Sequence, residues 1–188
     1  MSVKETNMTF PKYTNCRYLD ALAKKVLVFD GAMGTSLQTQ NLTAEHFVGS
    51  ALNLNPPEPD SEIKNLHRKI RNGADFFLTQ PIYRPEDGPA FLEKYAAVHG
   101  PLDRPMLASS LPLVSLKHAN FLHHEVPGVS IPEETRQRME KDGEDGPRVG
   151  VELAVELIQE TKSWAQGIYI MPQFNHYDMV ADIIEAVK

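Results

Sequence analysis

The sequence contains a single cysteine, Cys16, among its 188 residues. One cysteine cannot form an intrachain disulfide, and it cannot supply the thiolate cluster of a structural zinc site. No apolar stretch approaches the roughly 18 residues of a membrane-spanning helix, and residues 1–12 lack the apolar segment of a signal peptide. We therefore expect a cytoplasmic protein with no membrane partner.

Positive charge is also sparse. The chain has 19 Lys and Arg against 25 Asp and Glu, a net charge of -6, and its basic residues form no long run. Such a surface offers no electrostatic footprint for nucleic acid. Hydrophobic residues, by contrast, make up 41% of the chain, close to the globular average. The length and composition indicate a folded protein with a hydrophobic core rather than a disordered chain.

Helical patterns alternate with short apolar runs along the chain. The segments expected to be strands are 26–29, 48–52, 76–79, 105–109 and 167–171, and those expected to be helices are 15–25, 60–72, 85–98, 115–125, 132–141, 149–163 and 177–187. This alternation predicts the α/β class, with a parallel sheet covered by helices. The pattern alone allows a barrel or an open doubly wound sheet, although no strand is followed by Gly-x-Gly-x-x-Gly. Asp60 is expected to cap the helix 60–72, and Gly73 to end it.

Residues 26–35, Val-Leu-Val-Phe-Asp-Gly-Ala-Met-Gly-Thr, resemble the first strand and loop of the homocysteine S-methyltransferase domain. The resemblance covers about residues 16–47. It implies that Asp30 contacts the amino-acid part of homocysteine, since an Asp at the mouth of a barrel strand can hold an ammonium group. The family's zinc is held by later Gly-Cys and Cys-Cys motifs, which this sequence lacks. We therefore expect no metal site here, and zinc only in an intact methyltransferase parent.

From residue 48 onward the chain resembles the methylenetetrahydrofolate reductase family. The motifs occur in order and at the family's spacing: Ala51-Leu-Asn-Leu-Asn-Pro-Pro57, Asn65-Leu-His-Arg-Lys69, Gly73-Ala-Asp-Phe-Phe-Leu-Thr-Gln80, Gly128-Val-Ser-Ile-Pro132 and Gly167-Ile-Tyr-Ile-Met-Pro172. The family fold is an eight-stranded barrel that binds FAD and reduces methylenetetrahydrofolate with NADH or NADPH. The resemblance begins near the family's fifth strand. It implies a partial TIM (β/α)8 barrel, with about five parallel strands and covering helices.

The resemblance also implies roles for polar residues on the cofactor side. Four positions on one face of an expected helix match those that hold the adenosine and diphosphate part of the flavin: Glu62, Asn65, Arg68 and Lys69. Arg and Lys supply charge-assisted donors to phosphate. Asn53 matches a position near the ribityl chain or the phosphates. The alternatives are a solvated helix face with charged pairs for the four, and an ordinary polar turn residue for Asn53.

Three further residues match substrate positions. Gln80 ends an expected strand and matches a glutamine that bonds the pterin ring of folate, for which an amide offers both a donor and an acceptor; its alternative is a bond to a neighbouring loop. His118 and Leu122 match folate-lining positions where the family often has Gln and Phe. A metal site at His118 with His123 and His124 is disfavoured because the spacing fits no ligand pattern, and we expect these histidines on a helix surface.

The two resemblances together indicate an internally deleted form of a bifunctional enzyme, in which a methyltransferase domain precedes a reductase domain. The expected domains are 1–47 and 48–188, joined near Phe47-Val48. The family's general acid and its Arg-Gly-Asp segment have no counterpart here, so the catalytic residues stay unassigned. We expect an FAD-dependent methylenetetrahydrofolate reductase in truncated form. The alternatives are an inactive remnant that binds flavin or folate weakly and a homocysteine S-methyltransferase remnant. Open barrel edges would favour a homo-oligomer.

Overall fold

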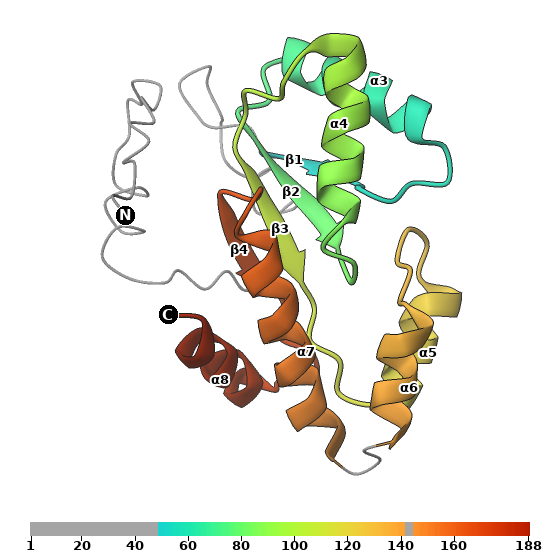
Figure 1. Ribbon diagram of the computed structural model, residues 1–188, viewed down its shortest axis with the longest axis vertical. Helices are drawn as coiled ribbons and strands as arrows, with labels where there is room; N and C mark the ends of the chain where they lie inside the picture. The colour runs from blue at the N-terminus through green and yellow to red at the C-terminus, as the bar shows by residue number, and fades with distance from the viewer. Residues whose placement is uncertain (1–48, 142–144) are drawn as a thin grey trace, which may run out of the picture. The chain divides into compact units, whose positions relative to one another are not determined.

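The computed structural model describes residues 49–141 and 145–188, which belong to one compact unit spanning 48–188 (Figure 1). The expected helix 15–25, the expected strand 26–29 and the candidate residue Asp30 lie outside the described residues. Within the described ranges, no helix combines the length and the apolar character needed to cross a bilayer. The assignment of 1–47 and 48–188 as two domains of different families stays a prediction.

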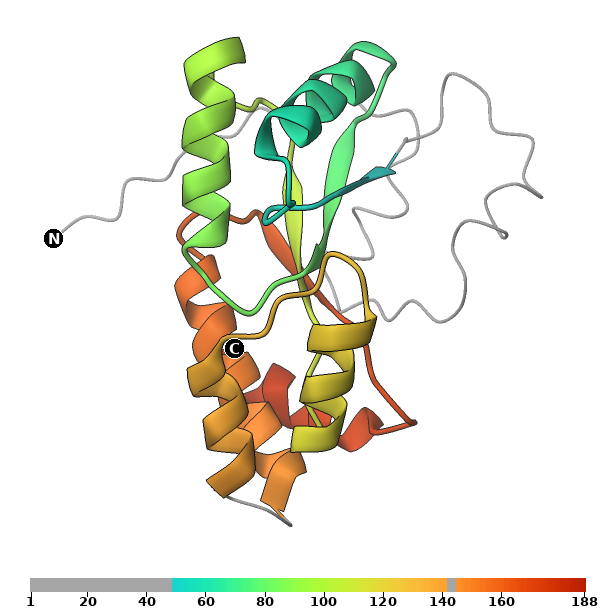
Figure 2. The ribbon, with the colours of Figure 1, turned by 90° about the vertical axis from the view of Figure 1, so that its right-hand side faces the viewer.

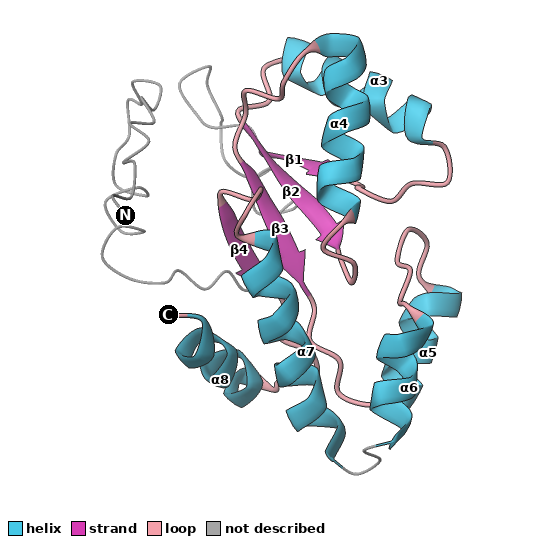
Figure 3. Cartoon of the chain, viewed as in Figure 1, coloured by secondary structure: helices cyan, strands magenta, loops and turns pink. Residues whose placement is uncertain are grey.

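The described residues form a four-stranded parallel sheet and six helices (Figure 3). The strands are β1 (Gly49–Leu52), β2 (Phe76–Pro81), β3 (Met106–Ser110) and β4 (Gly167–Ile170). The helices are α3 (Pro59–Arg71), α4 (Asp87–His99), α5 (Leu116–Glu125), α6 (Glu133–Lys141), α7 (Gly146–Thr161) and α8 (Tyr177–Val187). The α/β class is confirmed, and every expected helix and strand within the described ranges is present.

The strand order decides between the two topologies that the pattern allowed. The strands pair in parallel in the sequential order β1-β2-β3-β4. Helices α4 and α7 lie on the same side of the sheet in both views (Figures 1 and 2). A doubly wound sheet would reverse its strand order and carry helices on both faces. Sequential strands with helices on one side are the arrangement of a partial TIM-like barrel.

The two faces of the sheet differ in burial. Side chains alternate between the faces along each strand, and Phe77 and Met106, which are paired across β2 and β3, are 0% and 1% exposed. They pack with α3 and α4 side chains in one hydrophobic cluster. On the opposite face Phe76, Leu78 and Leu107 are only half-buried. This second face corresponds to the interior of a closed barrel.

Two local details differ from the sequence-based expectation. Asp60 does not cap α3: the helix begins at Pro59, Glu58 occupies the cap position, and no side chain caps the helix. Proline is favoured in the first turn because its φ is preset and its missing N–H would have no helical partner. Helix α7 begins at Gly146 rather than at residue 149, with a proline again in its first turn.

Candidate functional site

The carboxyl ends of β1 and β2 border a shallow polar pocket. Asn53 directly follows β1, and Gln80 lies near the end of β2. Both line this small surface pocket, together with Leu54, Asn55, Pro81, Ile82, Tyr83, Asp87, Gly128 and Ser130. The structure therefore brings two predicted site residues together at the end of the sheet where barrels bind their ligands.

An irregularity in β2 places Gln80 at this pocket. The register between β2 and β3 pairs Leu78 with Leu107 and Pro81 with Ser109, so β2 carries one extra residue over this stretch. Thr79 is buried, and its Oγ1 accepts a hydrogen bond of 2.8 Å from the Ser109 backbone N–H. The Gln80 side chain is exposed. A bulge of this kind re-aims one side chain, which here leaves the Gln80 amide open to a ligand.

The four predicted cofactor residues form a connected polar cluster on α3. The Arg68 Nη2 donates to the Asn65 Oδ1 at 3.0 Å, and the Asn65 Nδ2 donates to a Glu62 carboxylate oxygen at 3.5 Å. The Lys69 ammonium lies 3.6 Å from the Glu62 Oε1. These contacts follow from helical spacing, since residues three or seven apart lie on one face of a helix.

The α3 cluster continues to the pocket through β1. The Asn53 backbone N–H donates to the Glu62 Oε1 at 3.3 Å, and the Lys69 Nζ donates to the Ala51 carbonyl at 2.6 Å. Asn53 thus belongs both to the pocket and to the hydrogen-bonded chain that leads to α3. Gln80, Asn53 and the α3 cluster are therefore contiguous in space.

The fit to a flavin diphosphate differs among these cations. Arg68 is exposed, and of its guanidinium nitrogens only Nη2 donates to Asn65. The remaining donors can bind a phosphate group. Lys69 already donates a hydrogen bond to the Ala51 carbonyl and forms an ion pair with Glu62. In this cluster Arg68 is therefore the residue best placed to hold an anionic group, while Lys69 ties α3 to β1.

Gly128 brings a loop close to the pocket. Its φ is +83°, a conformation that disfavours other residues, and a Cβ placed on it would lie 3.0 Å from the Asn53 Nδ2. The Gly128-to-Pro132 motif thus has a local physical reason, because glycine lets the loop approach the Asn53 amide without crowding it.

His118 and Leu122, which were predicted to bind folate, do not line the pocket that contains Gln80. Both are buried in α5, at 6% and 7% exposure. The expectation of surface histidines is wrong for His118, whose Nδ1 accepts a 3.4 Å hydrogen bond from the Val114 backbone N–H. Its ring contacts Phe174 edge-on, with 5.3 Å between ring centroids. Within the described residues, no group of three or more His, Cys, Asp or Glu could hold a metal ion.

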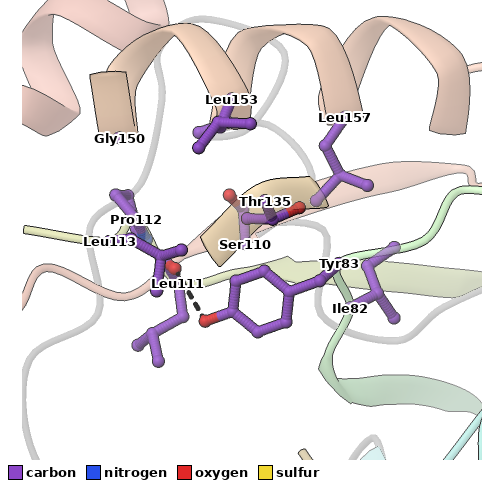
Figure 4. A pocket seen from close by; sticks show the side chains of 11 residues that line it. Ile82, Tyr83, Ser110, Leu111, Pro112, Leu113, Thr135, Gly150, Leu153 and Leu157 are labelled. Atoms are coloured by element: carbon purple, nitrogen blue, oxygen red, sulfur yellow. Dashed lines mark hydrogen bonds between the residues drawn. The ribbon is translucent and has the colours of Figure 1, made fainter. Parts of the chain in front are cut away.

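A second pocket lies between the strand ends and helices α6 and α7 (Figure 4). Its lining is mainly apolar, and the Tyr83 hydroxyl at its edge donates to the Leu111 carbonyl at 3.0 Å. No residue predicted to bind cofactor or substrate lines it. Burial raises the pKa of Tyr83 above its usual range, so the phenol stays neutral and acts as a structural donor.

Substituting glutamine for His118 is expected to reduce the loss of stability in acid. Burial lowers the pKa of His118 below its ordinary value of 6.5, so below about pH 6.5 the unfolded chain binds a proton that the folded chain does not. Stability is therefore lost as the pH falls through the folded-state pKa, at most by about 1.4 kcal/mol per pH unit for one proton. Melting temperatures from pH 8 to 5 should fall less steeply for His118→Gln. Parallel curves for the two proteins would contradict this prediction.

Comparison with known proteins agrees with this arrangement. The family model of methylenetetrahydrofolate reductase matches residues 50–188. No curated protein is similar enough in sequence to match. A solved structure of an uncharacterized protein from Clostridium thermocellum that binds two copies of 5-methyl-5,6,7,8-tetrahydrofolic acid is similar, with a TM-score of 0.55 and 18% identity over 78% of this chain and 54% of that chain. This chain thus spans about half the length of that protein, and at this identity the similarity shows the fold. The resemblance of residues 16–47 to homocysteine S-methyltransferase stays a prediction.

Proposed function

Because the chain belongs to the methylenetetrahydrofolate reductase family, we propose that it binds a reduced folate at the carboxyl ends of β1 and β2 and the adenine side of FAD on α3. The reaction is the reduction of 5,10-methylenetetrahydrofolate to 5-methyltetrahydrofolate, with NADH or NADPH as the donor. The observation that carries the proposal is that Asn53, which follows β1, and Gln80 of β2 line one pocket.

The substrate side of the proposal depends on Gln80. Its exposed amide offers a donor and an acceptor, which suit the polar edge of a pterin ring. The Clostridium thermocellum protein of similar fold binds 5-methyltetrahydrofolic acid, a ligand of the same class. A folate in this pocket would lie beside Asn53 and hence next to the hydrogen-bonded chain leading to α3.

The cofactor side depends on the α3 cluster. Arg68 would hold the diphosphate, and Asn65 and Glu62 would bond the adenosine part. Bound FAD would supply the hydride that reduces the folate. The residues of this chain contribute binding and orientation. The Glu62 carboxylate accepts a hydrogen bond from the Asn53 backbone N–H, and the Lys69 ammonium donates one to the Ala51 carbonyl of β1.

The alternative is binding of folate or flavin without reduction. The chain spans 54% of the related solved structure, and the sequence has no counterpart of the family's general acid. A remnant of homocysteine S-methyltransferase is the weaker alternative because the zinc cysteines are missing from the sequence. Turnover of methylenetetrahydrofolate with FAD and NADH or NADPH separates reduction from binding alone.

Two substitutions should separate the cofactor and substrate roles. Arg68→Ala is expected to weaken FAD binding by about 1.5–3 kcal/mol, since a hydrogen bond to a charged group is lost. ADP, which carries the same half of the cofactor, should be affected equally. Gln80→Ala is expected to weaken 5-methyltetrahydrofolate binding by about 0.5–1.5 kcal/mol and to leave FAD binding unchanged. Calorimetric titration of the 188-residue chain with each ligand measures both effects.

Lys64→Ala provides the matched control for Arg68→Ala. Lys64 is exposed on the same helix and carries the same charge, but it lies outside the cluster. It should change FAD affinity far less than Arg68→Ala. If Lys64→Ala and Arg68→Ala weaken FAD binding equally, the effect of Arg68 is one of net charge alone. If Arg68→Ala and Gln80→Ala each weaken FAD and folate binding to the same extent, the two residues do not have separate roles.

A further inference from the structure

Asp87 is a pocket residue to which the sequence pattern assigned no role. It is the first residue of α4 and follows β2 after a short loop. It lines the same pocket as Asn53, Gln80 and Asn55, and the Asn55 side chain favours the charged form of its carboxyl and so lowers its pKa. The pocket therefore holds one carboxyl group among several amides.

Keeping the Asp87 carboxyl charged at this half-buried position lowers the stability of the folded chain. Burial raises the pKa of Asp87, and the nearby Glu86 raises it further, whereas Arg84 and the Asn55 side chain lower it. Arg84 favours the charged form, yet the opposing effects together leave the pKa of Asp87 raised. A half-buried carboxyl at a pocket with convergent polar groups is a candidate for ligand contact.

The chemistry of the carboxyl selects one edge of a pterin. We propose that the Asp87 carboxylate accepts hydrogen bonds from the ring N–H and the 2-amino group of a 2-amino-4-oxopteridine, while the Gln80 amide donates to the neighbouring 4-oxo group. A carboxylate has two acceptor oxygens side by side, and this edge presents two donors at matching spacing. The assignment rests on the proposed function, since it requires a folate in this pocket, and it names the group that would select the pterin.

The test compares Asp87→Asn with Glu86→Gln, a matched loss of one negative charge from the neighbouring exposed residue outside the pocket. Each protein is titrated with 5-methyltetrahydrofolate and with its 2-desamino-2-methyl analogue, which lacks the 2-amino donor. The wild-type chain and Glu86→Gln should prefer the natural ligand. Asp87→Asn should bind the natural ligand about ten- to hundredfold more weakly, the usual effect of losing hydrogen bonds to a charged group, and should lose the preference.

A structural role is distinguished by two further readouts. Because the buried carboxylate is costly, Asp87→Asn should melt no lower than the wild-type chain at pH 7, whereas a structural aspartate would lower the melting temperature. Equal weakening of both ligands with the preference retained would overturn the inference. A wild-type chain that binds folate, with Asp87→Asn unchanged in affinity and preference, would overturn the role of Asp87 and leave the proposed function standing. A wild-type chain that binds neither ligand would overturn both.

Discussion

Replacing Gly150 with alanine is expected to destabilise the chain by about 3 kcal/mol, the upper part of the usual range for overpacking. Helix α7 packs directly against the backbone that follows β3. A Cβ on Gly150 would overlap the Leu113 carbonyl oxygen and would lie 3.2 Å from the Met179 Cε on α8. One turn earlier, a Cβ on Gly146 would lie 2.5 Å from the Val114 carbonyl oxygen. A backbone carbonyl cannot rotate away as a side chain can, so α7 itself must shift.

Urea unfolding followed by circular dichroism measures this loss. Gly167→Ala is the control, because a Cβ there would meet only the Leu107 side chain, at an ordinary 3.5 Å. It should stay within about 1 kcal/mol of the wild-type chain. A Gly150→Ala protein with the wild-type urea midpoint would show that α7 does not pack this closely on the segment after β3.

Gly146 and Gly150 also show where sequence reasoning was limited. The pattern of apolar residues placed each described strand and helix within a few residues, because the 3.6-residue periodicity of helices and the short apolar runs of buried strands are strong local signals. Glycine and proline, however, are ambiguous in sequence. The expected helix 149–163 left out Gly146 and Pro147, whereas in the structure these two residues form the first turn of α7, where proline is tolerated and glycine permits the backbone contact.

The candidate site also contains residues that the sequence could predict and residues that it could not. The α3 cluster could be predicted because Glu62, Asn65 and Arg68 are three residues apart on one helix, and their contacts are local. Asp87 could not, because its place beside Gln80 depends on the extra residue in β2 and on the loop before α4. The burial of His118 was missed because the ten-residue α5 is too short for a decisive apolar face.

The last prediction concerns the two faces of the sheet. Phe77→Ala is expected to cost about 3–5 kcal/mol of unfolding free energy, a large part of the roughly 5–15 kcal/mol typical of a folded protein. Phe77 is fully buried between the sheet and the helices. Phe76, its neighbour on the opposite face, lies over Gly49 of β1, where an added Cβ would come within 2.5 Å of its ring, but it is only half-buried. Phe76→Ala should therefore cost clearly less.

The ratio of these two costs tests the half-barrel arrangement. In a closed barrel the face of Phe76 would be interior, and both substitutions would be severe. Within the described sheet, β1 and β4 are the edge strands, and open edges favour pairing with a second copy. If a second copy covers the Phe76 face, the cost of Phe76→Ala should rise with protein concentration, because association stabilises the folded state by mass action. Urea unfolding of both variants over a hundredfold dilution, with light scattering at each concentration, separates the cases. A concentration-independent cost for Phe76→Ala as large as that for Phe77→Ala would contradict an uncovered inner face.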